Sequence, residues 1–258
     1  MAATASAPHT RNRAVFMNEY ISALSLWLTG AKTVESVHDD EGVIKFEAEH
    51  HHEVLDPRRM GDVACKLIAW REMIGLLGLV GKRPDRYGGA AYGNVSARIG
   101  PPSAVCGQRA MLISGTQTGG MGRVGLSDFC LVEQYDYDRN WVRSRGTTQP
   151  SSETMTHGAI YDLSPAIRFV LHAHSPVMWR ARQALRLPTT DPRVPYGTPQ
   201  MAREVQRLYR GSTVQATNLL AMGGHEDGII AFGETVEQAG QALVTWLGRA
   251  YEQTCRIS

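Results

Sequence analysis

Two histidines, His172 and His174, stand one residue apart in the segment VLHAHSP, at the end of an apolar run. Alternate side chains of a β-strand point to the same side, so a strand here projects both imidazoles together, with backbones about 7 Å apart. Two imidazoles placed in this way can share one small cation. Taken alone, the pair is explained equally well as two buried, hydrogen-bonded core histidines.

A third ligand is needed to hold a metal ion, and His225 is the best candidate. It stands in GGHEDG, a glycine-framed turn between apolar segments, where a side chain can point inward. Three neutral imidazoles leave positions open on a divalent ion, as a catalytic site requires. Taken alone, His225 can also be a turn residue that caps backbone groups. His50–His52 is better explained as a solvated loop, and His9 and His38 lie in polar segments.

Glu153 is the candidate acid/base, because it follows two serines at the predicted helix start PSSETMTH. A positioned carboxylate can move protons. Glutamate in the first turn of a helix is also ordinary capping chemistry, and Glu153 taken alone favours the capping role. His157 lies four residues further, on the same helix face. It is expected to orient Glu153, to support the metal ligands from behind, or to serve in packing.

Three turns rich in small hydroxyl and amide donors precede the histidine pair. They contain Asn94 and Ser96 in GNVS, Ser114 to Gly120 in SGTQTGG, and Ser151 and Ser152 in PSSE. Clustered N–H and hydroxyl donors with little bulk suit phosphate or carboxylate groups. Each stretch alone is only a turn, and the three together indicate an anion pocket.

The elements that would position these residues mix strands and helices without a regular βαβ rhythm, which indicates a mixed sheet covered by helices. Helical spacing predicts helices over residues 15–30, from Pro57 after an Asp56 N-cap to Gly78 or Gly81, after PSSE, over 199–209 and over 236–251. Strands are predicted over residues 43–50, in the glycine-rich segment that contains GNVS, and over residues 166–175. AVCG and RAMLIS are predicted to form a pair of strands, and a hairpin is predicted around residues 138–140. Two further strands are predicted on either side of GGHEDG.

Composition limits the classes of partner. The net charge is +2, from 27 basic and 25 acidic residues, which is too balanced to indicate a nucleic-acid groove. With 258 residues, 43% of them hydrophobic, the chain suits one large domain with an added arm. We expect an N-terminal arm over residues 1–55 and the metal-binding domain over residues 56–258.

The cysteines and the apolar runs indicate the cellular location of the protein. The four cysteines, Cys65, Cys106, Cys130 and Cys255, form no CxxC pair, which favours reduced thiols in a cytoplasmic protein. The N-terminal residues lack the apolar stretch of a signal peptide. The longest apolar run, MIGLLGLVG, is shorter than the roughly 20 residues that span a bilayer. We therefore expect a cytoplasmic protein with no membrane partner.

Five segments, taken in order over about residues 65–250, resemble the class II aldolase/adducin family, of the L-fuculose-phosphate aldolase type. They are GNVS, the ISGT loop, PSSE with a helix after it, HAHSP on a strand, and a histidine in a glycine-bounded turn before IIAFG. The resemblance implies an α/β fold, a three-layer α/β/α sandwich with a mixed, largely antiparallel central sheet. It also implies a homotetramer with the site at a subunit interface.

The resemblance assigns roles to individual residues. His172, His174 and His225 would bind a divalent metal ion, zinc first, with manganese or iron as alternatives. Glu153 would be the acid/base or a further ligand. A substrate phosphate would be held by the GNVS asparagine, the threonine loop and the paired serines, here Asn94, Ser114, Thr116, Ser151 and Ser152. Tyr196 in VPYGTP is a looser match to a catalytic tyrosine that reaches a neighbouring subunit's site.

The expected function is that of a metal-dependent lyase. It would cleave a small hydroxy-carbonyl or sugar-phosphate-like substrate by a retro-aldol reaction through a metal-bound enediolate, with Glu153 moving the proton. Dehydration and epimerisation pass through related intermediates, so a dehydratase or an epimerase remains the alternative. A non-haem iron oxygenase and a non-catalytic, adducin-like scaffold are the remaining classes.

Two departures from the family pattern bear on the substrate. The loop SGTQTGGMGR is long and places Gln117 where a bare glycine is expected, so this side chain would crowd a phosphate or select another acid group. His225 is followed by the acidic pair Glu226 and Asp227. Both departures weaken the case for a phosphorylated sugar and leave the metal site intact.

Overall fold

The computed structural model describes residues 42–255. Its main sheet contains β1 (Glu47–His52), β4 (Asn94–Arg98), β5 (Met111–Ser114), β6 (Phe129–Asp136), β7 (Trp141–Gly146), β8 (Phe169–His174), β9 (Leu219–Ala221) and β10 (Gly228–Gly233). The strand order is β1-β7-β6-β5-β4-β8-β10-β9. β1 and β7 are parallel, and the other neighbours are antiparallel. A separate pair consists of β2 (Gly81–Lys82) and β3 (Ala91–Tyr92). The expected mixed, largely antiparallel sheet is confirmed.

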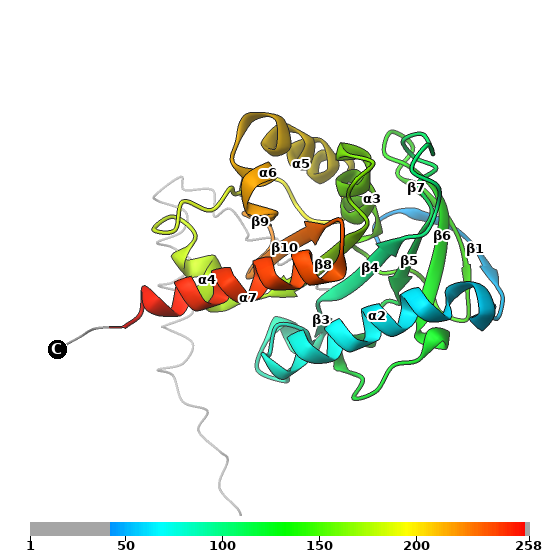
Figure 1. Cartoon of the computed structure of the whole chain (residues 1–258), viewed down its shortest axis with the longest axis horizontal. Coiled ribbons are helices and arrows are strands. Elements are labelled where there is room, and N and C mark those ends of the chain that lie inside the picture. Colours follow the sequence, from blue (N-terminus) through cyan, green and yellow to red (C-terminus); the bar gives the residue numbers. More distant parts are fainter. Residues whose placement is uncertain (1–41, 256–258) are drawn as a thin grey trace, which may run out of the picture. The chain divides into compact units, whose positions relative to one another are not determined.

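Helices cover both faces of the sheet (Figure 1). They are α2 (Pro57–Leu76), α3 (Thr154–Leu163), α4 (Pro176–Ala181), α5 (Pro199–Gly211), α6 (Val214–Thr217) and α7 (Val236–Glu252), with short 3-10 turns at Tyr87–Gly89, Thr118–Gly120 and Leu126–Asp128. None of the described helices is long and apolar enough to cross a membrane.

Two buried clusters, one on each face, make the structure a three-layer sandwich. On β8, Leu171 belongs to the cluster under α2, α4 and α7, whereas its neighbour Val170 belongs to the cluster under α3, α5 and α6. Adjacent strand residues point to opposite faces, so a continuous apolar run such as FVL serves both clusters. The expected α/β/α sandwich is confirmed.

The start of α2 follows from its sequence. Asp56 is the N-cap, its carboxylate accepts a hydrogen bond of 2.9 Å from the Arg58 amide, and Pro57 takes the first helical position. The helix ends at Leu76, and Gly78 follows with φ 71°. A left-handed residue at this point stops a helix, as the sequence predicted.

Some sequence predictions are wrong. The segment AVCG, residues 104–107, lies in turns and forms no strand, so β5 is the only strand of the predicted pair. The N-terminal strand begins at Glu47 rather than at residue 43, because its partner β7 begins at Trp141, directly after the hairpin turn. His50–His52 is the end of β1 and not a loop, since it pairs with residues 144–146.

Other predictions are extended or lie outside the described residues. The hairpin turn is confirmed at residues 137–140, with Asn140 in the left-handed region at φ 50°. The short helices α4 and α6 were not predicted. The predicted helix over residues 15–30, with His9 and His38, lies outside the described residues. β1 pairs with β7, so this part of the expected arm is a strand of the main sheet; the division of the chain at residue 55 stays a prediction.

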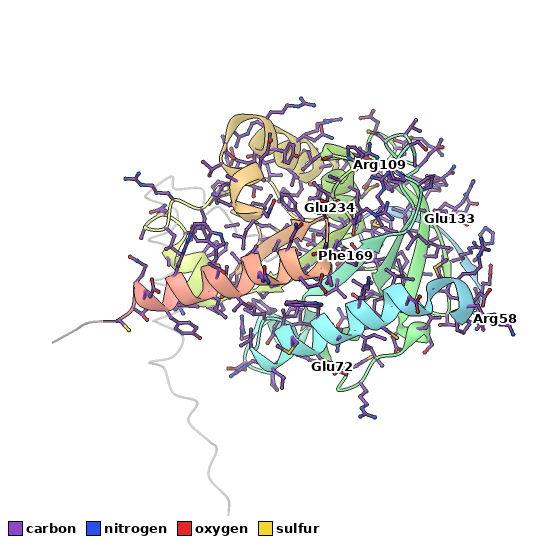
Figure 2. The ribbon with its side chains drawn as sticks, in the orientation of Figure 1. Arg58, Glu72, Arg109, Glu133, Phe169 and Glu234 are labelled. Carbon is purple, nitrogen blue, oxygen red and sulfur yellow. The ribbon has the colours of Figure 1, made fainter. Side chains whose placement is uncertain are left out.

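The C-terminal end of α3 is anchored by a polar cluster around Asp162. Its carboxylate accepts hydrogen bonds from the hydroxyls of Tyr135 (2.9 Å) and Tyr137 (2.8 Å). Arg109, labelled in Figure 2, places Nε 3.6 Å from Asp162 Oδ1. These contacts fix the direction of α3, and Glu153 stands at the other end of this helix.

Candidate metal centre

The three candidate histidines come together at one end of the sheet. His172 and His174 lie on β8, and His225 lies in the turn that precedes β10, which pairs with β8 so that Gly228 faces His174. One donor nitrogen from each histidine lies within 4.8 Å of the others. All three side chains are buried. The cluster could hold a metal ion.

Two glycines allow the backbone to approach the ligands closely. Gly93 has φ +77°, and a Cβ there would lie 2.7 Å from a methyl of Val80 and 3.1 Å from the His172 carbonyl oxygen. A Cβ at Gly228 would lie 2.7 Å from Cδ2 of His225. A side chain at Gly228 would therefore displace the His225 ring, and one at Gly93 would press on Val80 and on the backbone of His172.

Burial keeps the three imidazoles neutral. It lowers the pKa of His172 to about 3, and it lowers the pKa of His174 and of His225 well below the usual range, with a smaller contribution from the neighbouring positive charges. A neutral imidazole keeps a lone pair for a metal.

The donor set fits a divalent ion. Nε2 of His172 is buried and has no hydrogen-bond partner in the described part of the chain. A buried polar atom left without a partner is costly, and such cases usually have a specific cause. Three convergent neutral imidazoles are a common zinc donor set that leaves positions open for substrate. The residues present therefore fit a divalent metal ion.

Asn94 contacts His172 from the neighbouring strand. Its amide Nδ2 lies 3.2 Å from Nδ1 of His172, while its Oδ1 has no hydrogen-bond partner among the described residues. If Nε2 of His172 binds a metal, Nδ1 must carry the proton and needs an acceptor. Turning the amide by 180° supplies that acceptor, because its oxygen and nitrogen ends have nearly the same shape. Asn94 can therefore fix the tautomer of a ligand.

Glu153 faces the histidines and does not cap its helix. It occupies the N-cap position of α3, but its side chain makes no capping hydrogen bond. Its carboxylate is fully buried, and Oε1 lies 3.5 Å from Nε2 of His225. The hydroxyl of Ser151 accepts a bond of 3.3 Å from the Glu153 amide instead. The capping interpretation of Glu153 is thus wrong.

The predicted donor turns meet around one small pocket. Asn94, Thr116, Ser151 and Ser152 all line it, and its volume is about 260 Å³ with the space open to solvent included. No lysine or arginine is among its lining residues. The structure does not bring Ser114 to this pocket, because its hydroxyl accepts a hydrogen bond of 3.1 Å from the Val95 amide inside the sheet.

Gln117 lies at the edge of this pocket. It is in the left-handed region at φ 60°, and its Oε1 accepts a hydrogen bond of 3.2 Å from the Ala91 amide. Its Nε2 lies against Gly42, where a Cβ would be only 2.0 Å away. The side chain therefore crosses the space between Gly42 and Ala91, both of which line the pocket.

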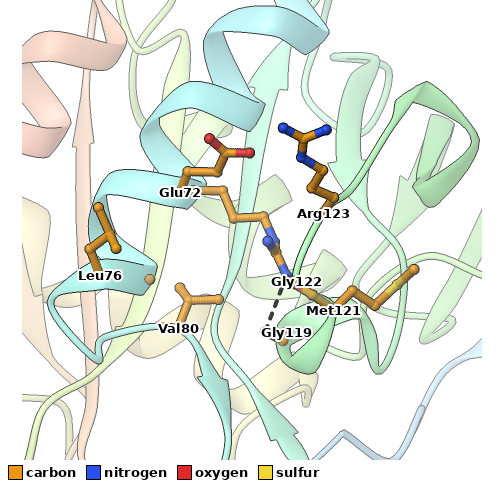
Figure 3. Close-up of a pocket in the computed structure, with 9 residues that line it drawn as sticks. Glu72, Leu76, Val80, Gly119, Met121, Gly122 and Arg123 are labelled. Atoms are coloured by element: carbon orange, nitrogen blue, oxygen red, sulfur yellow. Dashed lines mark hydrogen bonds between the residues drawn. The ribbon is translucent and has the colours of Figure 1, made fainter.

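The loop that lines the pocket is held from behind by Arg71 of α2. Nη2 of Arg71 donates to the carbonyls of Thr118 (2.6 Å), Gly119 (3.1 Å) and Met121 (3.0 Å). Figure 3 shows Gly119 and Met121 on this loop, across a separate cleft from Glu72, Leu76 and Val80. Arg71 is buried, so the loop position is set by a charged group shielded from water.

The His157 imidazole is hydrogen-bonded to β4 and not to Glu153. Its Nδ1 lies 2.6 Å from the Ser96 hydroxyl, which lies 2.7 Å from the Tyr161 hydroxyl. Burial, with a smaller contribution from His172, lowers the pKa of His157 well below its usual range. These contacts place His157, Ser96 and Tyr161 in one buried group, and they do not support the expectation that His157 orients Glu153.

Residues that the sequence did not single out cover the side of the cluster near His174. The rings of Tyr87 and Tyr92 lie 4.7 Å and 5.5 Å from the His174 ring, centroid to centroid. The Tyr87 hydroxyl donates to Oδ2 of Asp227 at 2.7 Å, and Arg86 places Nη2 3.4 Å from the same oxygen. In the sequence, these residues could have been found only from their position: YGGAAY directly precedes GNVS, and Asp227 lies two residues after His225.

Tyr196 covers the side near His225. Its ring is fully buried and lies 4.3 Å from the His225 ring. Nζ of Lys45 stands 3.8 Å from the centroid of the Tyr196 ring. The structure thus places Tyr196 beside His225 of its own chain, and it adds Lys45, which no motif indicated.

Comparison with known proteins relates this arrangement to one family. The model of the class II aldolase and adducin N-terminal domain matches residues 85–257. In sequence, no curated protein matches the chain. Among solved structures, an L-fuculose 1-phosphate aldolase is similar over 75% of this chain and 85% of its own, at 20% identity and a TM-score of 0.52.

Two further structures share the fold. A sugar-phosphate aldolase from Thermotoga maritima is similar over 76% of this chain and 94% of its own, at 14% identity and a TM-score of 0.54. YgbL from Escherichia coli, described as a candidate aldolase, epimerase or decarboxylase, is similar over 74% of this chain and 87% of its own, at 15% identity and a TM-score of 0.52. Since the family model covers well over half of its residues, this chain belongs to the class II aldolase and adducin family.

Proposed function

We propose that this protein is a metal-dependent lyase of the aldolase type that acts on a small hydroxy-carbonyl compound. The observation that carries the proposal is the buried group of His172, His174 and His225 with the Glu153 carboxylate 3.5 Å from His225. The three histidines would hold a divalent ion, zinc first and manganese or iron as alternatives. When bound, such an ion supplies Lewis-acid polarisation of a carbonyl and stabilises negative charge on oxygen.

The proton is moved by Glu153. In the cleavage direction, its carboxylate accepts the proton of the hydroxyl whose adjacent carbon–carbon bond breaks, and it then returns a proton to the released carbon. The burial of Glu153 keeps bulk water away from this exchange. The anchored helix α3 keeps the carboxylate at one distance from His225 while the proton moves.

Other residues bind and orient the substrate. Tyr196, buried against His225, is proposed as the second catalytic group, which holds a substrate hydroxyl. Thr116, Ser151 and Ser152 offer neutral hydroxyl donors at the pocket, and Asn94 lines it while also contacting His172. Ser114 is proposed only as a support of this wall, through its bond to Val95.

Dehydration or epimerisation by the same residues is the second candidate function. These reactions pass through intermediates related to those of retro-aldol cleavage, so the same three histidines and carboxylate would serve them. A non-catalytic scaffold has no use for a buried group of three histidines and a carboxylate. A homotetramer, as the family resemblance implies, is part of the proposal, and light scattering of the purified protein measures it.

The experiment uses the Glu153→Gln variant loaded with zinc. Deuterium exchange at the carbon next to the carbonyl of hydroxyacetone is followed by NMR, and bound metal is measured by mass spectrometry. The variant should keep its metal and lose exchange by about 100-fold or more. Glu234→Gln, an exposed position, is the matched control. Unchanged exchange in Glu153→Gln would exclude Glu153 from proton transfer. A wild-type protein that binds no metal would contradict the proposed function.

A further inference from the structure

Arg86 lies one layer of aromatic rings away from the candidate metal centre. Its guanidinium carbon stands 4.8 Å from the centroid of the Tyr87 ring and 4.9 Å from that of the Tyr92 ring. Both rings contact His174. The side chain is 19% exposed, so this cation is largely held by the two rings rather than by water.

The guanidinium keeps hydrogen-bond donors for a further acceptor. Its contacts to the Tyr87 hydroxyl and to Oδ2 of Asp227 both use Nη2. Among the described residues, Nε and Nη1 have no acceptor, and neither is sealed from solvent. The Asp227 contact is long, 3.4 Å, and the same oxygen already accepts the Tyr87 hydroxyl at 2.7 Å. The charge of Arg86 is therefore only partly used inside the protein.

The small pocket beside His172 offers no such charge. Its lining contains hydroxyls, amides and glycines but neither lysine nor arginine, and Gln117 crosses its edge. The pocket is also narrow, because Gln117 lies between Gly42 and Ala91 at its edge. An anionic substrate thus meets neutral donors near His172 and a cation near His174.

We propose that Arg86 binds a carboxylate of the substrate, so that the substrate is a small hydroxy-keto acid that reaches from the three histidines past the rings of Tyr87 and Tyr92 to the guanidinium; this inference rests on the proposed function. A carboxylate is favoured over a phosphate by shape. The rings of Tyr87 and Tyr92 cover one part of the guanidinium, and Asp227 occupies another. A planar carboxylate needs only one edge of the guanidinium, whereas a phosphate calls for donors on several sides.

The test measures binding rather than turnover. Dissociation constants of hydroxypyruvate, hydroxyacetone and dihydroxyacetone phosphate are measured by calorimetry on the zinc-loaded protein. The wild type should bind hydroxypyruvate about tenfold or more tighter than hydroxyacetone, the gain of a charge-assisted hydrogen bond. Arg86→Gln should abolish this preference and leave hydroxyacetone binding unchanged, and Arg86→Lys should restore part of it. Arg83→Gln is the control, because Arg83 lies in the same segment, is exposed and pairs with Asp85.

Each contrary result has a distinct meaning. Arg86 has no role in carboxylate binding if the wild type shows no preference, or if Arg86→Gln weakens all three ligands equally or none of them. If Arg86→Gln weakens the binding of dihydroxyacetone phosphate more than that of hydroxypyruvate, the choice of a carboxylate is overturned. A wild-type protein that takes up no metal overturns the proposed function instead. The comparison of hydroxypyruvate with hydroxyacetone in that metal-free protein still decides the role of Arg86.

Discussion

Nε2 of His225 lies 3.5 Å from Oε1 of Glu153, and both side chains are buried. The low pKa of His225 leaves its ring neutral, so this contact is not an ion pair of fixed charges. It places a carboxylate directly beside a candidate metal ligand. A substrate oxygen held at this centre would then lie within reach of a proton acceptor.

Replacement of one histidine tests the metal centre. In His172→Ala, two imidazoles remain, and bound zinc should fall several-fold because a two-ligand site holds the ion weakly. Mass spectrometry of the dialysed protein measures the zinc, and circular dichroism verifies folding. His52→Ala removes an exposed histidine of β1 and should leave the zinc content unchanged. Equal zinc in His172→Ala and wild type would exclude His172 as a ligand.

The buried histidines predict how stability depends on pH. In the folded, metal-free chain the pKa values of His157, His172, His174 and His225 are lowered by burial, that of His172 to about 3. In the unfolded chain they return to about 6.5. The unfolded state therefore binds more protons than the folded state below this pH. The contribution of the neutral histidines to the free energy of unfolding is complete above about pH 6.5, and it is lost as the solution is acidified towards pH 3.

One variant isolates a single histidine from this effect. Well below pH 6.5, each neutral buried histidine contributes a slope of about 1.4 kcal/mol per pH unit. His157→Gln should reduce the slope of the metal-free protein by about this amount, measured by urea unfolding at several pH values between about 4.5 and 5.5. The acidic residues common to both proteins cancel in the comparison. Parallel slopes would show that His157 is protonated in the folded state.

Gln117 should restrict the pocket beside His172. Gln117→Gly removes the side chain that crosses between Gly42 and Ala91, and glycine accepts the left-handed φ of 60° without strain. Dihydroxyacetone phosphate should then bind several-fold tighter, while hydroxyacetone binding stays unchanged. Arg186→Gly, at an exposed left-handed position (φ 52°) that does not line the pocket, is the control. If phosphate binding does not improve, Gln117 is not the limiting group.

Arg71 should stabilise the pocket loop. Arg71→Gln removes the donor to the carbonyls of Thr118, Gly119 and Met121, and it should lower the free energy of unfolding by about 2 kcal/mol. Arg123, which is exposed on the same loop (Figure 3), provides the control. Arg123→Gln should change the free energy of unfolding by less than about 0.5 kcal/mol. Urea unfolding measures both. Equal stabilities of the two variants would contradict the role of Arg71.

Local patterns predicted the elements that carry the candidate site. The apolar run that ends in VLHAHS predicted β8, the strand period placed its two histidines on one side, and Asp56 with Pro57 predicted the start of α2. The glycines around His225 predicted a turn between two strands. These predictions were correct because strand period, helix capping and turn conformation depend on residues that are close in the sequence.

Local patterns failed where a contact between distant segments decided the outcome. Glu153 stands where a capping residue belongs, yet its carboxylate faces His225 and not its own helix. Residues 43–46 alternate like a strand but precede β1, whose pairing with β7 begins at Glu47 and Trp141.

By itself the sequence determined the family and predicted the candidate ligands, through the order of GNVS, PSSE, HAHSP and His225. Only the tertiary structure decided that Asn94 contacts a ligand and that Arg86 lies over the tyrosines beside His174. The physical reason is that each of these contacts joins side chains from separate elements. Their distance is set by the packing of the whole sheet, which no local spacing encodes.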